Sequence, residues 1–226
     1  MNQDIPQRVR LTAPRAAAVA GILFSLLLIA SQVLIRLSVP ASPQDAGAWL
    51  VEGAGKVNLA LHLLPFAGIA FLWFIAVVRD RLGPKEDKFF STVFFGSGLL
   101  FLAMQFTSAA VAGGLLRVYG AAPGLIGAGL YSFGRTVTYE MTNVYTMKMA
   151  GVFMFSTCTL ALRTSIFPRW MAYLGFGLAL FLLLSLGRFD WAPLVFPLWV
   201  ILISSEILVA NLGRPRGQAS KPHGAP

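Results

Sequence analysis

The feature that most constrains this chain is a series of long apolar stretches, separated by short segments that carry most of the charges. A helix needs about 20 apolar residues to cross the hydrocarbon core of a bilayer, which is roughly 30 Å thick. The first stretch, AAAVAGILFSLLLIASQVLI, lies between Arg15 and Arg36 and is longer than the apolar part of a cleavable signal peptide. We therefore interpret it as a retained transmembrane helix.

Further stretches along the chain have a similar length and polarity. Because backbone N–H and C=O groups in lipid have no water to bind, each stretch is expected to be an α-helix. The sequence predicts an all-α, polytopic integral membrane protein whose single domain, residues 16–212, is a bundle of six transmembrane helices. The predicted helices cover about 16–36, 57–78, 89–114, 141–162, 170–186 and 191–212.

The composition agrees with lipid as the solvent of this chain. Of the 226 residues, 57% are hydrophobic and 12% are charged, whereas soluble domains have about 25% charged residues. The single Cys cannot form an internal disulfide. The net charge of +9 would suit nucleic acid only on a basic, water-exposed domain, and no segment is long and polar enough to form one. No nucleic-acid partner is expected.

The basic residues instead indicate the orientation in the membrane, because short loops rich in Lys and Arg stay in the cytoplasm. They gather in the tail 1–15, in the tail 213–226 and in the loops after the second and fourth predicted helices. Both termini are therefore expected in the cytoplasm, and the predicted location is a bacterial inner membrane. The tail 213–226 has almost no apolar residues to bury and is predicted to be disordered.

The segment 117–140 is the least regular part of the predicted domain. It is rich in Gly and contains Pro123, yet the run LIGAGLYSF within it is apolar. We expect an irregular segment on the outer side of the membrane. The sequence leaves open whether it is interfacial or re-entrant.

Polar residues within the predicted helices are candidates for function, because such side chains are unfavourable in lipid. Since successive helices alternate in direction, Gln32, His62, Gln105 and Lys148 are all expected in the outer half of the bilayer. The spacing of Glu140 and Lys148 places acid and base on one helix face. These five residues define a predicted polar pocket that opens outward. Alternatively, the glutamines and His62 form hydrogen bonds between helices, and Lys148 reaches the headgroups.

The motifs of soluble enzymes, such as H-E-x-x-H, C-x-x-C and G-x-S-x-G, are absent from the sequence. His62 is the only His within a predicted helix, so one chain cannot supply two His ligands to a haem in the membrane. A haem ligated by His62 and a Met, or a quinone beside His62, stays open as an alternative. No cofactor or metal site is otherwise predicted.

A short run late in the chain carries a family resemblance. The sequence RTSIFPRWMAYLGFG begins at Arg163 and places Pro168, Arg169 and Trp170 in a turn before a helix that contains glycine. This run resembles the bacterial multi-pass membrane proteins grouped as domain of unknown function 4386, where a comparable turn joins two late helices. The resemblance covers about the last third of the chain. It implies a similar architecture, and it implies no activity or site residues.

Three functions follow from these observations, and an enzyme is not the favoured one. The first is non-enzymatic binding or transport of a small solute or amphiphile through the outward-facing pocket. The second is an accessory subunit that packs against partner subunits of a larger membrane complex. The third is a membrane-bound redox protein that uses His62.

Overall fold

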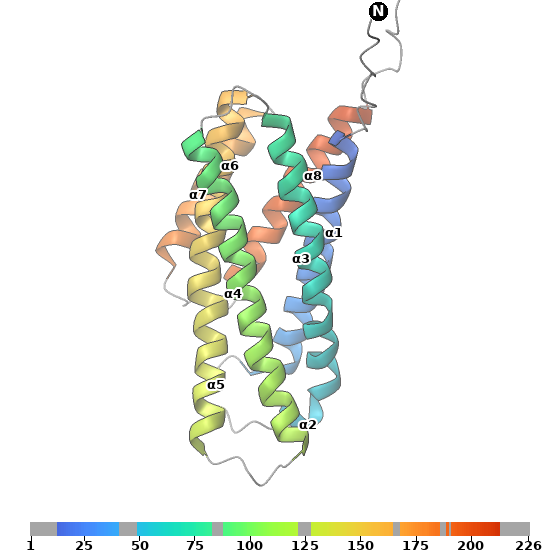
Figure 1. Cartoon of the computed structure of the whole chain (residues 1–226), viewed down its shortest axis with the longest axis vertical. Coiled ribbons are helices and arrows are strands. Elements are labelled where there is room, and N and C mark those ends of the chain that lie inside the picture. Colours follow the sequence, from blue (N-terminus) through green and yellow to red (C-terminus); the bar gives the residue numbers. More distant parts are fainter. Residues whose placement is uncertain are drawn as a thin grey trace, which may run out of the picture.

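The computed structural model describes residues 13–40, 49–82, 88–121, 128–164, 168–185, 189 and 191–212 of this chain. Every secondary-structure element within these residues is helical (Figure 1). The elements are α1 (Ala13–Ser38), α2 (Trp49–Glu52), α3 (Ala54–Leu82), α4 (Lys88–Ala121), α5 (Ala128–Glu140), a π-helical segment (Met141–Tyr145), α6 (Thr146–Thr164), α7 (Arg169–Leu184), a 3-10 turn (Ala192–Leu194) and α8 (Val195–Leu212). The predicted all-α class is confirmed.

Among the described residues, four helical stretches are long and apolar enough to cross a membrane. They are Ala16–Ser38, Ala54–Arg79, Phe89–Tyr119 and Ala192–Ala210. These stretches coincide with the first, second, third and sixth predicted spans, which fits a helical membrane protein. The helix α7 is also apolar but shorter. The tails 1–12 and 213–226 lie outside the described residues.

The helices form an elongated bundle whose two ends differ (Figure 1). At the end of the bundle where α1 begins, α1 packs along α3 and α8, and α6 packs along α4 and α7. The helices α7 and α8 occupy only this part of the bundle, whereas α1, α3 and α4 continue to the other end, where α2 and α5 lie (Figure 1). We call these parts the aromatic half and the polar half, after the side chains that line their interiors.

The aromatic half is filled by fully buried phenylalanine rings. The ring centroid of Phe71 on α3 lies 4.5 Å from that of Phe24, 5.4 Å from that of Phe101 and 5.1 Å from that of Phe153. Such tilted and edge-on pairs are favourable beyond the area that they bury. The buried group comprises Phe24, Phe71, Phe74, Phe94, Phe101, Phe153 and Phe196, which come from α1, α3, α4, α6 and α8. One cluster therefore joins helices from across the bundle.

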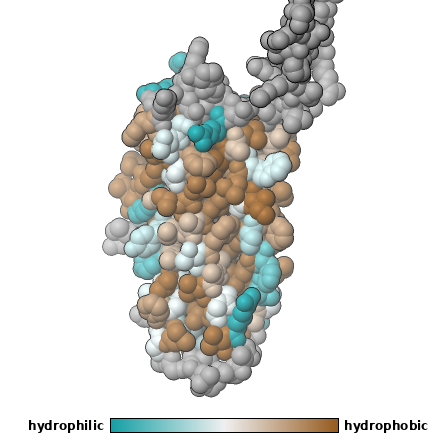
Figure 2. Space-filling view, in the orientation of Figure 1, coloured by the Kyte–Doolittle hydropathy of each residue, from teal (hydrophilic) through white to brown (hydrophobic). Residues whose placement is uncertain are grey.

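The outer surface of the bundle is also apolar over much of its length. Figure 2 shows hydrophobic residues across most of the visible face, with hydrophilic patches among them. Large side chains such as Leu23, Phe66, Trp73, Leu100 and Leu198 are exposed on different helices. A soluble monomer rarely exposes apolar surface on this scale. The surface fits a lipid environment.

The structure differs from the sequence prediction over the segment 117–140. The helix α4 runs to Ala121, and α5 occupies Ala128–Glu140, while the residues between them lie outside the described part. Tertiary packing here overrides the low helix propensity of glycine. Tyr131 of α5 is buried against Trp49, and a Cβ atom on Gly134 would lie only 2.8 Å from a methyl carbon of Leu115. Gly134 thus allows α5 to approach α4 closely.

The helices α5 and α6 are joined without a loop, because the π-helical segment Met141–Tyr145 continues the same helix. The hydroxyl of Thr146 donates to the carbonyl oxygen of Met141 (2.7 Å), which is the residue five positions earlier. The side-chain amide of Asn143 donates to the carbonyl oxygen of Tyr139 (3.0 Å). The fourth predicted span, 141–162, therefore begins inside a longer helix. Single π turns within α-helices occur frequently at functional sites.

Candidate binding cavities

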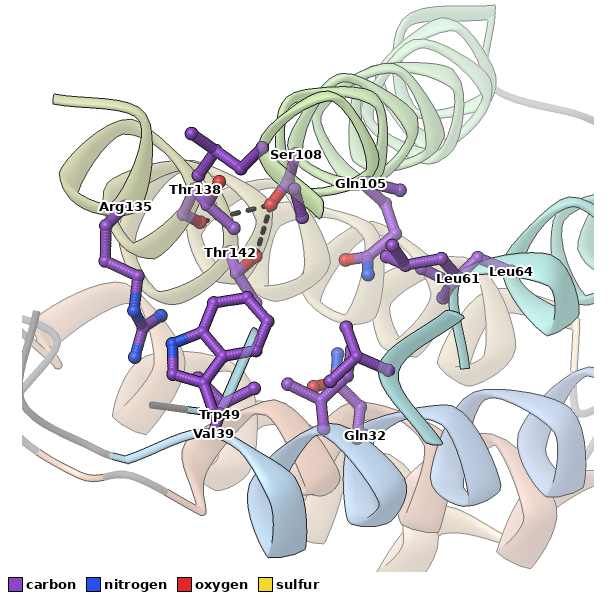
Figure 3. A pocket seen from close by; sticks show the side chains of 15 residues that line it. Gln32, Val39, Trp49, Leu61, Leu64, Gln105, Ser108, Arg135, Thr138 and Thr142 are labelled. Carbon is purple, nitrogen blue, oxygen red and sulfur yellow. Dashed lines mark hydrogen bonds between the residues drawn. The ribbon is translucent and has the colours of Figure 1, made fainter. Parts of the chain in front are cut away.

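Two adjoining cavities lie inside the polar half, between the C-terminal part of α1 and the helix α5. The first has a volume of about 70 Å³ and is bounded by α1, α2, α3, α4 and α5 together with the π-helical segment. Most of its wall is apolar and includes Ile35, Val57, Leu61, Leu64, Ala112 and Leu115. Its polar lining residues are Gln32, Gln105, Ser108, Arg135, Thr138 and Thr142 (Figure 3). Helices from most of the chain thus contribute to one site.

Two buried amides face this first cavity from opposite walls. Gln32 on α1 is 8% exposed, and Gln105 on α4 is 5% exposed. Figure 3 shows both amide groups turned into the cavity. The side-chain oxygen Oε1 of Gln105 is buried and accepts no hydrogen bond from the described residues. A buried acceptor without a donor destabilises a protein by about 1–3 kcal/mol, so this oxygen would gain from a donor on a bound molecule.

Hydroxyl groups connect α4 to the wall formed by α5 and the π-helical segment. The hydroxyl of Ser108 donates to the carbonyl oxygen of Thr138 (3.1 Å), and its oxygen lies 2.7 Å from the hydroxyl oxygen of Thr142. Figure 3 draws both interactions at the edge of the cavity. Thr142 belongs to the π-helical segment, so this irregular turn forms part of the cavity wall.

Arg135 brings a positive charge to the cavity wall. Its guanidinium donates through Nη2 to the carbonyl oxygen of Pro40 (2.5 Å), just beyond the end of α1. The guanidinium carbon lies 5.8 Å from the ring centroid of Trp49, which is within the range of a cation–π interaction. The indole N–H of Trp49 in turn donates to the hydroxyl of Tyr131 (2.9 Å). Contacts from α1, α2 and α5 therefore position Arg135.

The second cavity adjoins the first and is more polar. It has a volume of about 60 Å³, and Gln32, Arg135, Thr138 and Thr142 line both cavities. Its remaining wall adds Arg36, Pro40, Tyr139, Asn143 and Pro193. Two arginines from opposite helices thus line this cavity, and its described lining residues include no acidic side chain.

The structure places two of the five predicted site residues, Gln32 and Gln105, in the first cavity. His62 does not line either cavity and is exposed on α3. Its Nδ1 donates to the carbonyl oxygen of Asn58 (2.7 Å) within the same helix. The neighbours Leu61 and Leu64 face the cavity instead. An apolar stretch does not reveal which face of its helix is buried, and this is why spacing alone did not place His62.

Lys148 and Glu140 also lie apart from the cavities. The ammonium group of Lys148 donates to the carbonyl oxygens of Leu183 and Ser185, the latter at 2.7 Å. These carbonyls lie at the C-terminal end of α7, where backbone acceptors lack partners within the helix and a positive charge is favourable. Glu140 is the last residue of α5, immediately before the π-helical segment, and its side chain is exposed. The two side chains are not brought together at one pocket, because α7 packs along α6 and ends near Lys148.

The sequence interpretation missed Arg135, Thr138 and Thr142 as site residues. Arg135 and Thr138 lie in the segment 117–140, for which the sequence predicts an irregular structure, and Thr142 lies at the start of the fourth predicted helix. The signal was nevertheless present, because these three residues follow one another at intervals of three and four, the spacing of one helix face. A helix through this segment would have placed all three on one wall.

Within the part of the chain that the structure describes, no group of three or more His, Cys, Asp or Glu side chains could hold a metal ion. Comparison with models of protein families, with curated protein sequences and with solved structures finds no match to this chain. The resemblance around Pro168 stays a prediction. The geometry of the cavities is therefore the basis on which a function can be proposed.

Proposed function

We propose that this chain is a six-span protein of a bacterial inner membrane that binds a small amphiphile in the cavities of the polar half. The observation that carries the proposal is the first cavity itself, with apolar walls and two buried amides turned inward. Ligand sites in proteins are typically concave, mostly apolar and furnished with a few fixed polar groups. The buried oxygen of Gln105, which accepts no hydrogen bond from the described residues, supports the same proposal.

The proposed spans are α1, α3, α4, α6, α7 and α8. Arg79, Arg163 and Arg169 lie at the helix ends nearest the N-terminal end of α1, and this basic end is assigned to the cytoplasm. The helix α4 has 34 residues, which at 1.5 Å per residue gives about 51 Å, more than the roughly 30 Å of the hydrocarbon core. The polar half therefore extends to the outer membrane surface, and its cavities face outward in this arrangement.

The proposal favours binding over passage through the bundle. Between the cavities and the basic end lies the buried phenylalanine group, in which Phe71 contacts rings from three other helices. A solute moving toward the cytoplasm would have to displace these rings. Transport would therefore require a second arrangement of the aromatic half.

The proposal can be tested with amphiphiles that share one short chain, because cavities of this size suit a small molecule. Purified protein in a maltoside detergent would be titrated with hexanol, hexanoate and hexylammonium while the fluorescence of Trp49, a cavity-lining residue, is followed. The signal of Trp49 is isolated by subtracting the same titration of Trp49→Phe. We expect a saturable change with at least one probe.

The matched variants are Ala112→Leu, which fills the first cavity, and Ala110→Leu, which alters an exposed position on the same helix. Ala112→Leu should abolish the saturable change, and Ala110→Leu should retain it. Leu64→Phe narrows the cavity from α3 and serves the same purpose if Ala112→Leu does not accumulate. The proposal fails if no probe saturates, or if both cavity variants bind like the unaltered protein.

The accessory-subunit function has one observation in its favour. An apolar groove of about 410 Å³ lies between α1 and α3 and is lined by residues such as Ala16, Ala20, Leu23, Phe66 and Trp73. A transmembrane helix of a partner subunit would pack in such a groove. Repeated recovery of one partner chain after gentle extraction would support this function, whereas a chain recovered alone would count against it. The redox function of His62 stays a prediction, and its test is a haem absorption band that disappears in His62→Ala.

A further inference from the structure

The buried oxygen of Gln105 limits which molecules suit the first cavity. Gln105 is 5% exposed, and its amide is turned into the cavity (Figure 3). Its Oε1 atom accepts no hydrogen bond from the described residues. A buried acceptor without a donor is unfavourable, because it has lost its hydrogen bonds to water. A molecule that brings a donor to this oxygen therefore binds more tightly than the same molecule without the donor.

The hydroxyl groups of the cavity wall do not supply this donor, because each has a single hydrogen and uses it within the chain. The hydroxyl of Ser108 donates to the carbonyl oxygen of Thr138 (3.1 Å). The contact of 2.7 Å between the hydroxyl oxygens of Ser108 and Thr142 then uses the hydrogen of Thr142. The hydroxyl of Thr138 donates to the carbonyl oxygen of Gly134 (2.8 Å).

Two N–H-bearing side chains of the same wall, Trp49 and Arg135, also bind within the chain. The indole N–H of Trp49 donates to the hydroxyl of Tyr131 (2.9 Å). The guanidinium of Arg135 donates to the carbonyl oxygen of Pro40 and lies against the ring of Trp49. Neither side chain donates to Oε1 of Gln105. The donor for this oxygen has to come from a bound molecule.

A hydroxyl group on the ligand fits the two amides that face the first cavity. A hydroxyl has one hydrogen to donate and lone pairs that accept. It can donate to Oε1 of Gln105 and accept from the amide of Gln32, which is turned into the cavity from α1 (Figure 3). An ionised carboxylate has no hydrogen for Gln105. An ammonium group would be buried where the described lining has no acidic side chain, which is unfavourable for a charge.

We infer that the ligand is a neutral amphiphile whose head group is a hydroxyl that donates to Oε1 of Gln105. This inference rests on the proposed function of the cavities and narrows it to one class of ligand. The apolar part of the ligand contacts the apolar wall of the first cavity, which includes Val57, Leu61 and Leu115. The wall provides hydrophobic contact, and Gln105 provides selectivity, because a site that hydrogen-bonds a hydroxyl rejects an analogue without it.

The test compares two probes that differ in one hydrogen-bond donor. Hexanol and pentyl methyl ether have the same number of heavy atoms and both accept hydrogen bonds, but only hexanol donates one. Each is titrated as above, and its free concentration is corrected for uptake into the detergent micelles. Hexanol should bind about tenfold more tightly than the ether, as expected for one hydrogen bond to a buried acceptor. Hexanoate, hexylammonium and ethanol, which lacks the longer chain, should all bind more weakly than hexanol.

Variants of the two amides assign the donor to one wall. Gln105→Leu should reduce the preference for hexanol over the ether to about twofold or less, and Gln105→Met serves the same purpose if Gln105→Leu does not accumulate. Gln32→Leu should weaken both probes by the same factor, because the oxygen of either probe can accept from Gln32. The control Thr107→Val, at an exposed position of α4 that lines neither cavity, should leave both affinities unchanged.

Equal affinities of hexanol and the ether for the unaltered protein overturn the inference while the proposed function stands, because water then satisfies Gln105. A preference for hexanol that survives in both Gln105 variants also overturns it. Hexanoate or hexylammonium that binds more tightly than hexanol overturns the neutral head group. Ethanol that binds as tightly as hexanol overturns the amphiphile. If no probe saturates, the proposed function itself fails.

Discussion

The aromatic half and the polar half share the helices α1, α3 and α4, yet different kinds of side chain line their interiors. Along α1, Phe24 and Leu28 belong to the buried core, and Gln32, four residues further, lines the first cavity. On α4, Phe101 packs in the phenylalanine group, and Gln105 faces the cavity one turn later. A single helix therefore changes from close packing to a polar wall within one turn. We therefore expect substitutions in the aromatic half to change mainly the stability of the bundle and substitutions in the polar half to change mainly the proposed binding.

The largest expected effect comes from removing the centre of the aromatic half. Phe71→Ala should lower the free energy of unfolding by about 3–5 kcal/mol, because it leaves a cavity among several rings. Unfolding in a mixed detergent and denaturant titration measures this change. Phe66→Ala, at a side chain on α3 that is 62% exposed, is the matched control and should change the free energy by less than about 1 kcal/mol. Equal effects of the two variants would contradict the central packing role of the buried phenylalanine group.

An intermediate effect is expected at the boundary between the halves. Lys148→Met should lower stability by about 1–2 kcal/mol, because carbonyl oxygens at the end of α7 lose a charged donor. Lys56→Met, at an exposed position near the start of α3, should have little effect on thermal unfolding. Binding of hexanol to the folded variant should be unchanged. If Lys148→Met instead lost hexanol binding at unaltered stability, Lys148 would be a residue of the binding site.

The smallest expected effect is an increase in the free energy of unfolding. Gln105→Leu replaces a buried amide, whose oxygen accepts no hydrogen bond from the described residues, by an apolar side chain of similar size. We expect the free energy of unfolding to rise by about 1 kcal/mol, because the desolvation penalty of the amide is removed. Binding of the preferred probe should weaken at the same time. A variant that is less stable and binds normally would show that Gln105 serves packing.

The sequence predicted the helices where length and polarity are local properties of the chain. The apolar stretch before Arg36 and the stretch that contains His62 both correspond to helices that could cross a membrane. The sequence did not predict α5, because its burial depends on Trp49 and Leu115, which are distant in the chain. The partners of Lys148 are likewise 35 and 37 residues away. Gln32 and Gln105 could be named as candidates because a polar side chain within an apolar stretch stands out without any tertiary information. His62 stands out in the same way, yet it lies on an exposed face of α3.

Because no loop separates α5 from α6, a tilt of α6 would move α5 with it. The helix α6 lies among the proposed spans, and α5 carries Arg135. The helix α5 has 13 residues and is about 20 Å long, so a tilt of α6 by about 10° would move the far end of α5 by about 3 Å. Helices adjust their tilt to the thickness of the bilayer. A change in membrane thickness would thereby shift the wall of the cavities, and ligand affinity would depend on the lipid composition around the protein.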